Sequence, residues 1–412
     1  MQRIRISLPY YALYGWDVEI VTVDENYTDF KKEKLLLEGL PANLPVHKVN
    51  AWDKIWTSKF GLGSIALRSL WFYRKKVNEL LKKKRFDLIF FSTTQFPVCI
   101  LGPYWKKKFG IPYVIDMQDP WHSTYYQDKP KKERPPKHQF AYRLNQYLES
   151  IALKSVDGLM SVSASYISDL KHRFPAIGRV PAATIPFGIY RQDLQIANES
   201  NAGVAILTPD KINLVYIGRG GNDMKRSIET LFKVYKAGLT DQHKYFDRIQ
   251  LYFIGTSYAA AGQGKKTILP LAEKYGIADY VVEVTDRVGY FESLKLLQQA
   301  DALYIPGSDD PRYTASKIYP YLLVNKPIIA IFNKESSAIK ILQEFGVKNV
   351  FNYQDSRDID IYEFLTALAL RKLLPDKLNQ AAVIKYSAKQ LTYLQCCLFD
   401  QVLQSSDPGK WQ

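Results

Sequence analysis

The sequence predicts an α/β protein with two parallel sheets that the chain builds one after the other. Short apolar runs recur along the chain, and stretches of helical period, such as 227–237 and 290–300, lie between them. Runs of this kind are typical of parallel strands that are buried on both faces. Because the runs form two successive series, we expect two Rossmann-like lobes facing across a cleft.

The first series of runs lies in the N-terminal half. Its expected strands, each followed by an aspartate or a serine, are 18–23, 86–91, 112–115 and 158–162. Polar strand ends are where a doubly wound sheet carries its ligand-binding loops. The chain begins, however, with Ile4, Leu8 and Tyr11 at near-helical spacing rather than with a strand and a glycine-rich turn. We therefore expect an N-lobe that lacks its first strand.

The second series of runs sets the domain division. Its expected strands are 212–217, 249–254, 280–284, 302–305 and 327–331. Between the two series the chain is polar, rich in small residues and weakly patterned, which is typical of a linker. We expect an N-terminal lobe at 1–194, a linker at 195–210, a second lobe at 211–375 and a C-terminal segment at 376–412. The proline- and lysine-rich stretch 127–137 predicts an exposed loop.

The composition limits the kinds of partner. The 412 residues carry 56 Lys and Arg against 41 Asp and Glu, a formal charge of +15. This excess favours phosphorylated ligands, nucleic acid or an anionic membrane surface, unless it is only the general charge of a basic protein. Three cysteines make no disulfide framework and indicate a reducing cytoplasm, and five scattered histidines predict no metal site. The longest uncharged run, 88–105, is too interrupted by polar residues and prolines to predict a membrane span.

A glycine-rich turn follows the expected strand 212–217 and precedes a helix. Glycines let backbone amides approach a phosphate, and the helix start and nearby cations add positive charge. The residues that we expect to bind a donor phosphate here are Gly218, Arg219, Gly220, Gly221 and Lys225. The spacing matches neither the dinucleotide fingerprint nor a P-loop, so a plain tight turn is the alternative.

A second polar loop follows the expected strand 302–305 and runs into a helix. Ser316 offers a hydroxyl and Lys317 an ammonium group, which suits a diphosphate. We therefore expect both residues at the donor site. The alternative is a helix N-cap beside a solvated lysine.

Two carboxylates and a histidine follow the expected strand 112–115. We predict Asp119 and His122 as catalytic residues, because an Asp or His at a strand end can orient or deprotonate a substrate hydroxyl. Alternatively, Asp119 is a turn residue before Pro120, and His122 is structural.

A basic and aromatic stretch occupies 65–85. Arg68, Trp71 and Arg74 are expected on the acceptor or membrane side, and the upstream aromatics Trp52, Trp56 and Phe60 add bulk that suits insertion among lipids. The alternative is a helix with its apolar face in the core and a solvated basic face.

These segments together resemble the GT-B glycosyltransferases with family 4-like lobes. Residues 116–121, Asp-Met-Gln-Asp-Pro-Trp, look like that group's Asp-x-x-Asp-Pro-Trp motif. Residues 316–322, Ser-Lys-Ile-Tyr-Pro-Tyr-Leu, with Asn-Lys-Pro at 325–327, look like its Ser-Lys-x-Tyr-Glu-Tyr-Leu and Gly-Lys-Pro segment. Gly218-Arg219 lies where members carry a donor-phosphate loop, and 185–188 resembles a segment near the lobe junction. The resemblance covers nearly the whole chain.

The resemblance implies transfer of a sugar from a nucleotide-diphosphate sugar to a cell-surface glycan, lipid-linked or other acceptor, with no cofactor or metal and with retention. It implies that Arg219 and Lys225, with Ser316 and Lys317, stabilise the departing diphosphate, and that Asp119 or His122 handles the acceptor. The last helix, expected at 386–403, would cross back to the first lobe. The expected location is the cytoplasm, with peripheral contact at the inner face of the membrane.

Departures from the family pattern leave two alternatives. Relatives usually carry glutamates where this chain has Arg312 and Pro320, and the missing first strand predicts a start downstream of the true one or an incomplete lobe. The alternatives are an inactive sugar-nucleotide-binding partner in polysaccharide assembly and a GT-B-type sugar-nucleotide epimerase. We expect no nucleic-acid partner, because the basic residues accompany no recognised binding module.

Overall fold

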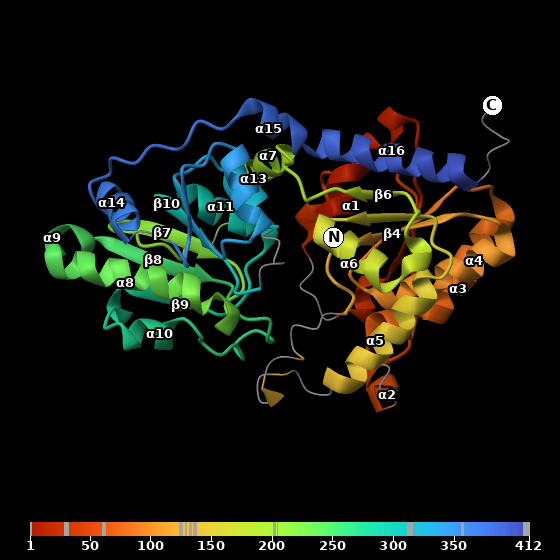
Figure 1. Cartoon of the computed structure of the whole chain (residues 1–412), viewed down its shortest axis with the longest axis horizontal. Helices are drawn as coiled ribbons and strands as arrows, with labels where there is room; N and C mark the ends of the chain where they lie inside the picture. The colour runs from red at the N-terminus through yellow and green to blue at the C-terminus, as the bar shows by residue number, and fades with distance from the viewer. Residues whose placement is uncertain are drawn as a thin grey trace. The chain divides into compact units, whose positions relative to one another are not determined.

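The computed structural model describes residues 2–28, 33–59, 63–122, 127, 130–131, 134, 138–200, 203, 205–310, 316–355 and 358–406. The chain divides into two compact units. The first unit is Met1–Gly188 with Ala388–Gln412, and the second unit is Ile189–Ser387 (Figure 1). Most of the loop expected at 127–137 lies outside the described residues.

The main sheet of the first unit is parallel and has the order β3-β4-β5-β6. Its strands are β3 (Ile89–Ser92), β4 (Tyr113–Met117), β5 (Gly158–Ser161) and β6 (Ala182–Thr184). A separate parallel pair joins β1 (Ile20–Val23) to β2 (Val46–Val49). In the described part of the chain, helix α1 rather than a strand precedes β1.

Seven α-helices of the first unit are described. They are α1 (Gln2–Ser7), α2 (Lys54–Lys59), α3 (Ile65–Lys83), α4 (Leu101–Phe109), α5 (His138–Leu153), α6 (Ala164–Arg173) and α16 (Ala388–Ser406). Short 3-10 turns lie at Leu8–Tyr10, Ala12–Tyr14, Glu25–Tyr27, Lys34–Leu37, Phe96–Ile100 and Pro175–Ile177.

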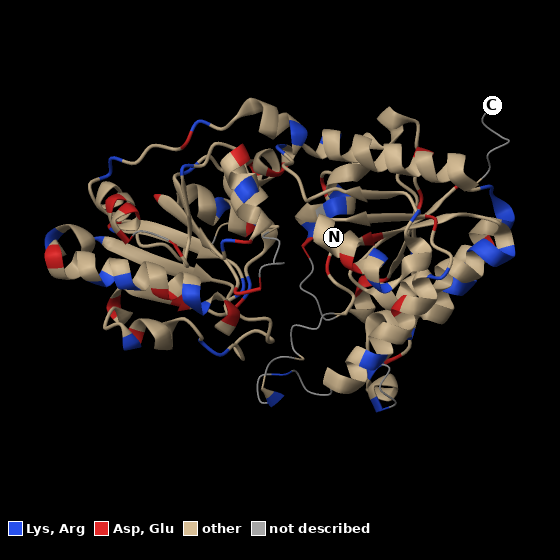
Figure 2. Cartoon of the chain, in the orientation of Figure 1, with Lys and Arg blue, Asp and Glu red and all other residues tan. Residues whose placement is uncertain are grey.

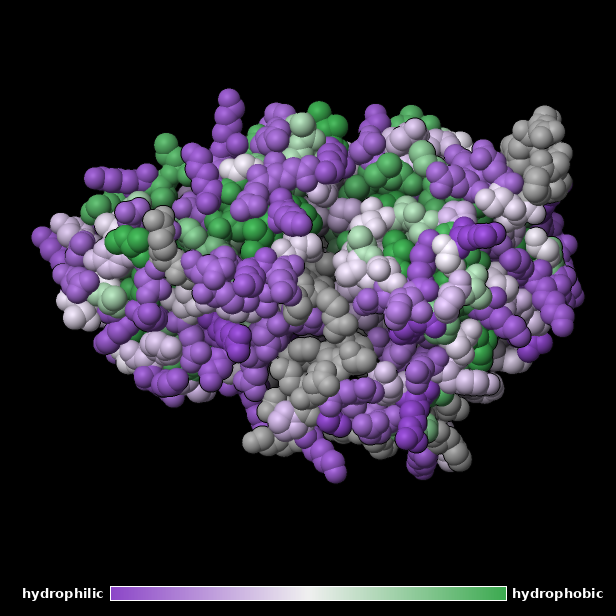
Figure 3. All heavy atoms as spheres, in the orientation of Figure 1, coloured by the Kyte–Doolittle hydropathy of each residue, from purple (hydrophilic) through white to green (hydrophobic). Residues whose placement is uncertain are grey.

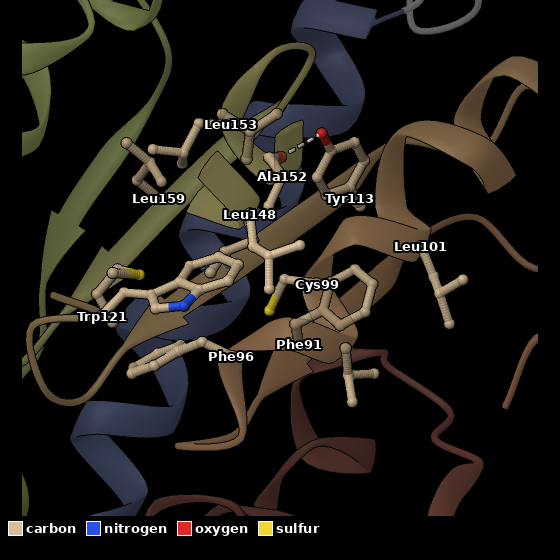
Figure 4. Close-up of a cluster of buried hydrophobic side chains, with 14 of the residues drawn as sticks. Phe91, Phe96, Cys99, Leu101, Tyr113, Trp121, Leu148, Ala152, Leu153 and Leu159 are labelled. Atoms are coloured by element: carbon tan, nitrogen blue, oxygen red, sulfur yellow. Dashed lines mark hydrogen bonds between the residues drawn. The ribbon is translucent and has the colours of Figure 1, made fainter. Parts of the chain in front are cut away.

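The side chains of β4 alternate between two cores, as the pleat of a strand requires. Tyr113 and Ile115 belong to a cluster with residues of α4 and α5, and Figure 4 shows Tyr113 beside Ala152 there. Val114 belongs to the cluster on the opposite face, with residues of α16. A strand buried on both faces in this way produces the continuous apolar run that the sequence shows.

Helix α16 covers one face of the first unit's sheet. It contacts β5, β6 and α1, and the Gln395 amide accepts from the Tyr11 hydroxyl at 2.7 Å and donates to Ser7 Oγ at 2.8 Å. A Cβ atom on Gly158 would lie 2.6 Å from a Val402 methyl group, so glycine allows the helix to approach β5 this closely. The return to the first lobe that we expected of 386–403 corresponds to this helix.

The sheet of the second unit is also parallel, with the order β12-β11-β10-β7-β8-β9. Its strands are β7 (Ile212–Ile217), β8 (Ile249–Ile254), β9 (Val281–Val284), β10 (Ala302–Pro306), β11 (Ile328–Phe332) and β12 (Asn349–Asn352). The helices are α7 (Gln192–Glu199), α8 (Lys225–Asp241), α9 (His243–Phe246), α10 (Leu269–Lys274), α11 (Tyr290–Gln299), α12 (Ile318–Leu323), α13 (Ser337–Glu344), α14 (Asp358–Ala369) and α15 (Gln380–Lys385), with 3-10 turns at Asn222–Met224 and Ala278–Tyr280.

The prediction of a linker at 195–210 is wrong for residues 195–199, which are helical. Helix α7 occupies Gln192–Glu199 and contacts α11 within the second unit. Its residues Ile196 and Ala197 are buried, and the carboxylate of Asp193 accepts a hydrogen bond from the Tyr290 hydroxyl at 2.7 Å. The helix is polar on its outer side, which is why its sequence has the composition of a linker.

The surface of the molecule is mainly hydrophilic, as expected for a chain in which 24% of the residues are charged. Hydrophilic residues, in purple, predominate on the face shown in Figure 3, whereas the apolar side chains of the strands lie in the cores. Within the described ranges, we find no helix with the length and apolar content needed to span a membrane.

Tyr113→Phe should destabilise the first unit by about 1–2 kcal/mol, because it removes one buried hydrogen bond while keeping the ring. The Tyr113 hydroxyl donates to the backbone carbonyl of Ala152 at 2.7 Å (Figure 4). The free energy of unfolding from urea denaturation measures the loss. Tyr147→Phe, at an exposed position of α5, is the control and should change stability by less than about 0.5 kcal/mol. Equal effects of the two substitutions would contradict the expectation.

Candidate functional site

The order of strands in the second unit reverses between β7 and β10. From β7 the chain passes outwards to β8 and β9, whereas β10, β11 and β12 lie on the other side. Loops after β7 and β10 therefore diverge, and open parallel sheets bind ligands beside the carboxyl ends of strands at such a switch point. Gly218 directly follows β7, and Ser308 lies two residues after β10. The predicted glycine-rich turn thus lies at the switch point.

Lys317 lies against the backbone of Gly218. A Cβ atom on Gly218 would lie 2.0 Å from Lys317 Nζ and 2.5 Å from the Tyr216 hydroxyl, so any larger residue here would displace both groups. The ammonium group lies 3.4 Å from the Tyr216 hydroxyl and 5.4 Å from the centre of that ring. This packing holds the cation at the carboxyl end of β7.

The pKa of Lys317 is lowered to about 7, first by burial and then by the positive charges of Arg287 and Arg219. Three cationic side chains therefore influence one another in this part of the second unit. An anion bound among them would favour the charged form of Lys317 and offset the repulsion. The electrostatics suit a ligand that carries more than one negative charge.

A carboxylate positions Arg219. Its Nη1 and Nη2 donate to Asp223 Oδ1 and Oδ2 at 2.8 and 2.6 Å, and the Ser308 hydroxyl donates to Asp223 Oδ2 at 2.8 Å. Although burial acts to raise it, the hydrogen bonds and charge of Arg219 hold the pKa of Asp223 below its ordinary value. Asp223 therefore stays charged and joins the loop after β7 to the loop after β10.

The other two glycines complete the turn. Gly221 has a φ of 152°, a conformation that L side chains rarely adopt. A Cβ atom on Gly220 would lie 2.9 Å from the Thr267 hydroxyl, so the next loop packs directly on this glycine. Glu283 fixes that loop, because its buried carboxylate accepts hydrogen bonds from the successive backbone N–H groups of 267–269.

The structure does not bring the other two predicted donor residues into this cluster of described side chains. Lys225 is exposed at the start of α8, and its Nζ lies 3.9 Å from the Glu229 carboxylate. Ser316 is exposed beside Lys317. Their part in donor binding stays a prediction.

Asp119 follows a buried polar network at the carboxyl end of β4. The Asp116 carboxylate pairs with Arg3 at 2.7 Å and accepts hydrogen bonds from Gln118 at 2.8 Å and Ser92 at 3.2 Å. Asp119 itself reaches the surface, but the surrounding protein displaces enough water to raise the pKa of its carboxyl. A carboxyl group with a raised pKa is better suited to accept a proton than an ordinary aspartate.

His122 lies in a buried ion-pair network of the first unit. Its side chain is 5% exposed, and Nδ1 lies 3.1 Å from Glu149 Oε2. Arg173 pairs with the same carboxylate, and the Tyr142 ring packs edge-on against the imidazole at 5.1 Å. The imidazole is thus held by Glu149, and its catalytic role stays a prediction.

The three residues expected on the acceptor or membrane side do not share one environment. Arg68 is only 5% exposed and donates to the backbone carbonyls of Trp52 and Tyr27 at 2.6 and 3.0 Å. These carbonyls hold the guanidinium inside the unit, so Arg68 does not offer it to a membrane, and the expected acceptor-side role of the three residues stays a prediction. Trp71 and Arg74 are exposed, and the Arg74 guanidinium lies 4.5 Å from the centre of the Tyr104 ring.

The family comparison matches the first unit. Residues 14–192 match the model of the family described as Glycosyltransferase Family 4. This stretch is therefore similar to a glycosyltransferase family 4 domain. The match confirms the predicted resemblance to family 4-like glycosyltransferases and the predicted class of enzyme. No curated protein sequence matches the chain.

Several solved structures share the fold over most of both chains. The UDP-forming α,α-trehalose-phosphate synthase of Burkholderia xenovorans is 13% identical, with a TM-score of 0.53 over 82% of this chain and 78% of that one. The synthase of Burkholderia multivorans is 12% identical, with a TM-score of 0.52 over 83% and 76%. The N-terminal domain of Candida albicans trehalose-6-phosphate phosphatase is 14% identical, with a TM-score of 0.58 over 97% and 92%. At these identities the likeness shows the fold alone, and it confirms the predicted GT-B class with two Rossmann-like lobes.

The predicted residues Gly218, Arg219 and Lys317, with the side chains around them, form what we call the donor cluster. Four of its residues were not predicted from the sequence, and they are Tyr216, Asp223, Arg287 and Ser308. Two of them carry a local signal. Tyr216 is a polar-tipped residue in an apolar run, and Asp223 follows Arg219 by four residues, a common spacing for an ion pair. Arg287 and Ser308 only follow other expected strands, so the order of those strands was needed to relate them to Gly218.

Lys317→Met should change how stability depends on pH. Folding lowers the pKa of Lys317 from 10.5 to about 7, so above pH 7 the unfolded chain binds more protons than the folded chain. The wild type therefore gains stability from this group as the pH rises, and the variant does not. Relative to the wild type, the variant should be most stable near pH 7 and lose this advantage towards about pH 10.

Thermal midpoints of both proteins across this pH range measure the effect. Lys233→Met, which removes an exposed lysine of α8, is the control and should differ from the wild type by a nearly constant amount. A constant difference for Lys317→Met would contradict the lowered pKa.

Proposed function

We propose that the second unit binds a nucleotide-diphosphate sugar and that the chain transfers its sugar to a glycan, a lipid-linked sugar or another acceptor bound by the first unit. The observation that carries the proposal is the packing of Lys317 on Gly218, with Arg219 nearby, at the switch point of the second sheet. Fixed cations there suit the charge that develops on a departing diphosphate. One solved structure of the same fold is a UDP-forming synthase in complex with glucose-6-phosphate, which supports a nucleotide-sugar donor and a sugar acceptor.

In the proposed reaction, the bond between the anomeric carbon and the diphosphate oxygen breaks. The nucleoside diphosphate leaves with the electron pair, and protonated Lys317 and Arg219 stabilise its charge. An acceptor hydroxyl oxygen forms the new bond to the anomeric carbon, and its proton passes to Asp119 or to the leaving group. These two cations supply charge that a metal ion supplies in other phosphate sites, so we include metal independence in the proposal. Retention rests on the family resemblance.

Each of the three candidate functions would need the donor cluster. They are the proposed transferase, an inactive sugar-nucleotide-binding partner and an epimerase. What would separate them is the binding of an acceptor, which we propose takes place in the first unit with Asp119. Of the two positions that depart from the family's glutamates, Pro320 lies in α12 beside the buried Tyr319 and Tyr321, and Arg312 lies outside the described residues.

A thermal-shift screen of UDP-, GDP-, ADP- and CMP-sugars tests the donor site. One donor should raise the unfolding midpoint of the wild type, because a ligand at about 100 times its Kd stabilises the native state by about 2.7 kcal/mol. Lys317→Ala and Arg219→Ala should lose most of this shift. Lys233→Ala, at an exposed position of α8, should keep it. If no donor shifts the wild type, or if all variants respond alike, the proposed donor site is wrong.

Asp119→Asn should separate transfer from donor binding. With the donor found in the screen, the variant should show the same thermal shift as the wild type but transfer the sugar at least about 100 times more slowly, because it lacks a base. Formation of a glycosylated product from glycan and lipid-linked acceptors measures the rate. Asp169→Asn, an exposed aspartate on α6, should transfer normally. Normal transfer by Asp119→Asn would remove this residue from the mechanism.

A further inference from the structure

The first unit exposes a group of large apolar side chains on α2, on α3 and just before α2. The exposed fractions are 54% for Trp52, 74% for Ile55, 68% for Trp56 and 51% for Trp71. Together with Phe72, these residues form what we call the Trp patch. Protein surfaces normally carry single, scattered apolar residues, whereas three exposed tryptophans lie in one region here. The core does not account for them, because α3 uses another face, with Ala66, Leu70 and Val77, to pack against the core of this unit.

The Trp patch is held in place by side-chain and backbone contacts. The Trp52 ring lies 6.2 Å from the Trp71 ring and 5.2 Å from the Phe72 ring. Buried Arg68 donates to the Trp52 carbonyl at 2.6 Å, and the Trp52 N–H donates to the Arg68 carbonyl at 3.0 Å. These contacts bind the segment before α2 to α3, so the aromatic side chains are presented on a fixed support.

Positive charge surrounds the Trp patch. Lys59 Nζ lies 5.0 Å from the centre of the Trp56 ring, and Lys75 Nζ lies 5.3 Å from the centre of the Trp71 ring. Residues 52–85 contain ten Lys and Arg against Asp53 and Glu79. Of these ten, Arg68 is buried, Lys76 and Lys83 pair with Glu79, and Lys84 pairs with Glu19. Figure 2 shows these basic residues in blue on α2 and along α3. Cations therefore border the exposed aromatic rings directly.

We propose that the Trp patch binds the headgroup region of a bilayer that contains anionic phospholipids. Tryptophan is favoured at the boundary between headgroups and acyl chains, because its ring is apolar and its N–H is polar. Lysines beside the rings meet the lipid phosphates, whose charge is of the opposite sign. The contact is peripheral, since it uses exposed side chains of α2 and α3. It does not depend on the proposed transfer reaction.

The charges favour this occupant over two others. A second copy of the chain would bring the same basic residues against the Trp patch, and like charges oppose association. A neutral glycan could stack on the tryptophans but would leave the surrounding cations without a counter-charge. An anionic lipid surface offers an apolar boundary region to the rings and phosphate groups to the cations.

Co-sedimentation of the full chain with vesicles tests the proposal. The wild type should bind vesicles of phosphatidylcholine with about 30% phosphatidylglycerol and bind pure phosphatidylcholine at least about tenfold more weakly. Raising NaCl from about 0.1 to 0.5 M should weaken binding to the anionic vesicles. Tryptophan fluorescence should shift to shorter wavelength on binding, because the rings leave water.

Paired variants identify the surface. Ile55→Ser with Trp56→Ser, and separately Lys59→Glu with Lys75→Glu, should each reduce binding at least about tenfold. The matched controls lie in the second unit: Leu374→Ser for lost apolar exposure, and Lys372→Glu with Lys377→Glu for reversed charge. Both controls should bind as the wild type does.

Three outcomes would overturn the proposal. They are equal binding to neutral and anionic vesicles, unchanged binding by both patch variants, and a dimer in sedimentation velocity that the Ile55→Ser, Trp56→Ser variant abolishes. The thermal shift with the donor sugar, measured without lipid, should be normal in all these variants. A normal donor shift without vesicle binding would therefore reject the membrane surface alone, and vesicle binding without a donor shift would reject the proposed function alone.

Discussion

The carboxylate of Asp223 joins the two loops on which the candidate donor site depends. It receives hydrogen bonds from Arg219, after β7, and from Ser308, after β10, while the Asp309 N–H donates to the Asp223 carbonyl at 2.7 Å. Since β7 and β10 are neighbours in the sheet, this connection spans the switch point. It also brings one negative charge to a region that holds Arg219 and Lys317. Without it, these partly buried cations would repel one another with no counter-charge from the described side chains around them.

A buried carboxylate has a comparable place in the first unit. Asp116 is the last residue but one of β4, and its partner Arg3 comes from α1, more than a hundred residues earlier in the chain. Helix α16, from the far end of the chain, packs beside α1 on the same face of the sheet. The loop that carries Asp119 therefore begins from a strand end whose carboxylate is already held by Arg3, Gln118 and Ser92. The same unit presents the Trp patch through Arg68, which serves as an internal support.

Most of the strands that the sequence predicted are buried apolar runs, although β1 and β3 are only partly buried. All nine expected runs correspond to strands, and β4, β5, β7 and β8 are buried along their whole length. The strands β2, β6 and β12 were missed, because their residues are partly exposed and include polar or small side chains. Position at a sheet edge does not explain the difference, because β1 and β3 also lie at edges and were predicted from their apolar runs. Helix α7 was missed for the related reason that only one side of it is buried.

The sequence by itself determined the two parallel sheets, the glycine-rich turn after β7 and the cationic character of the donor loops, because these features depend on local periodicity and neighbouring residues. Only the tertiary structure decided which cations meet. Lys317, far from Gly218 in the chain, lies against it because β10 is placed beside β7. Lys225, close in sequence, faces Glu229 along the exposed side of α8. Arg68 is likewise basic in sequence and buried in the structure, since two backbone carbonyls lie where its guanidinium can reach them.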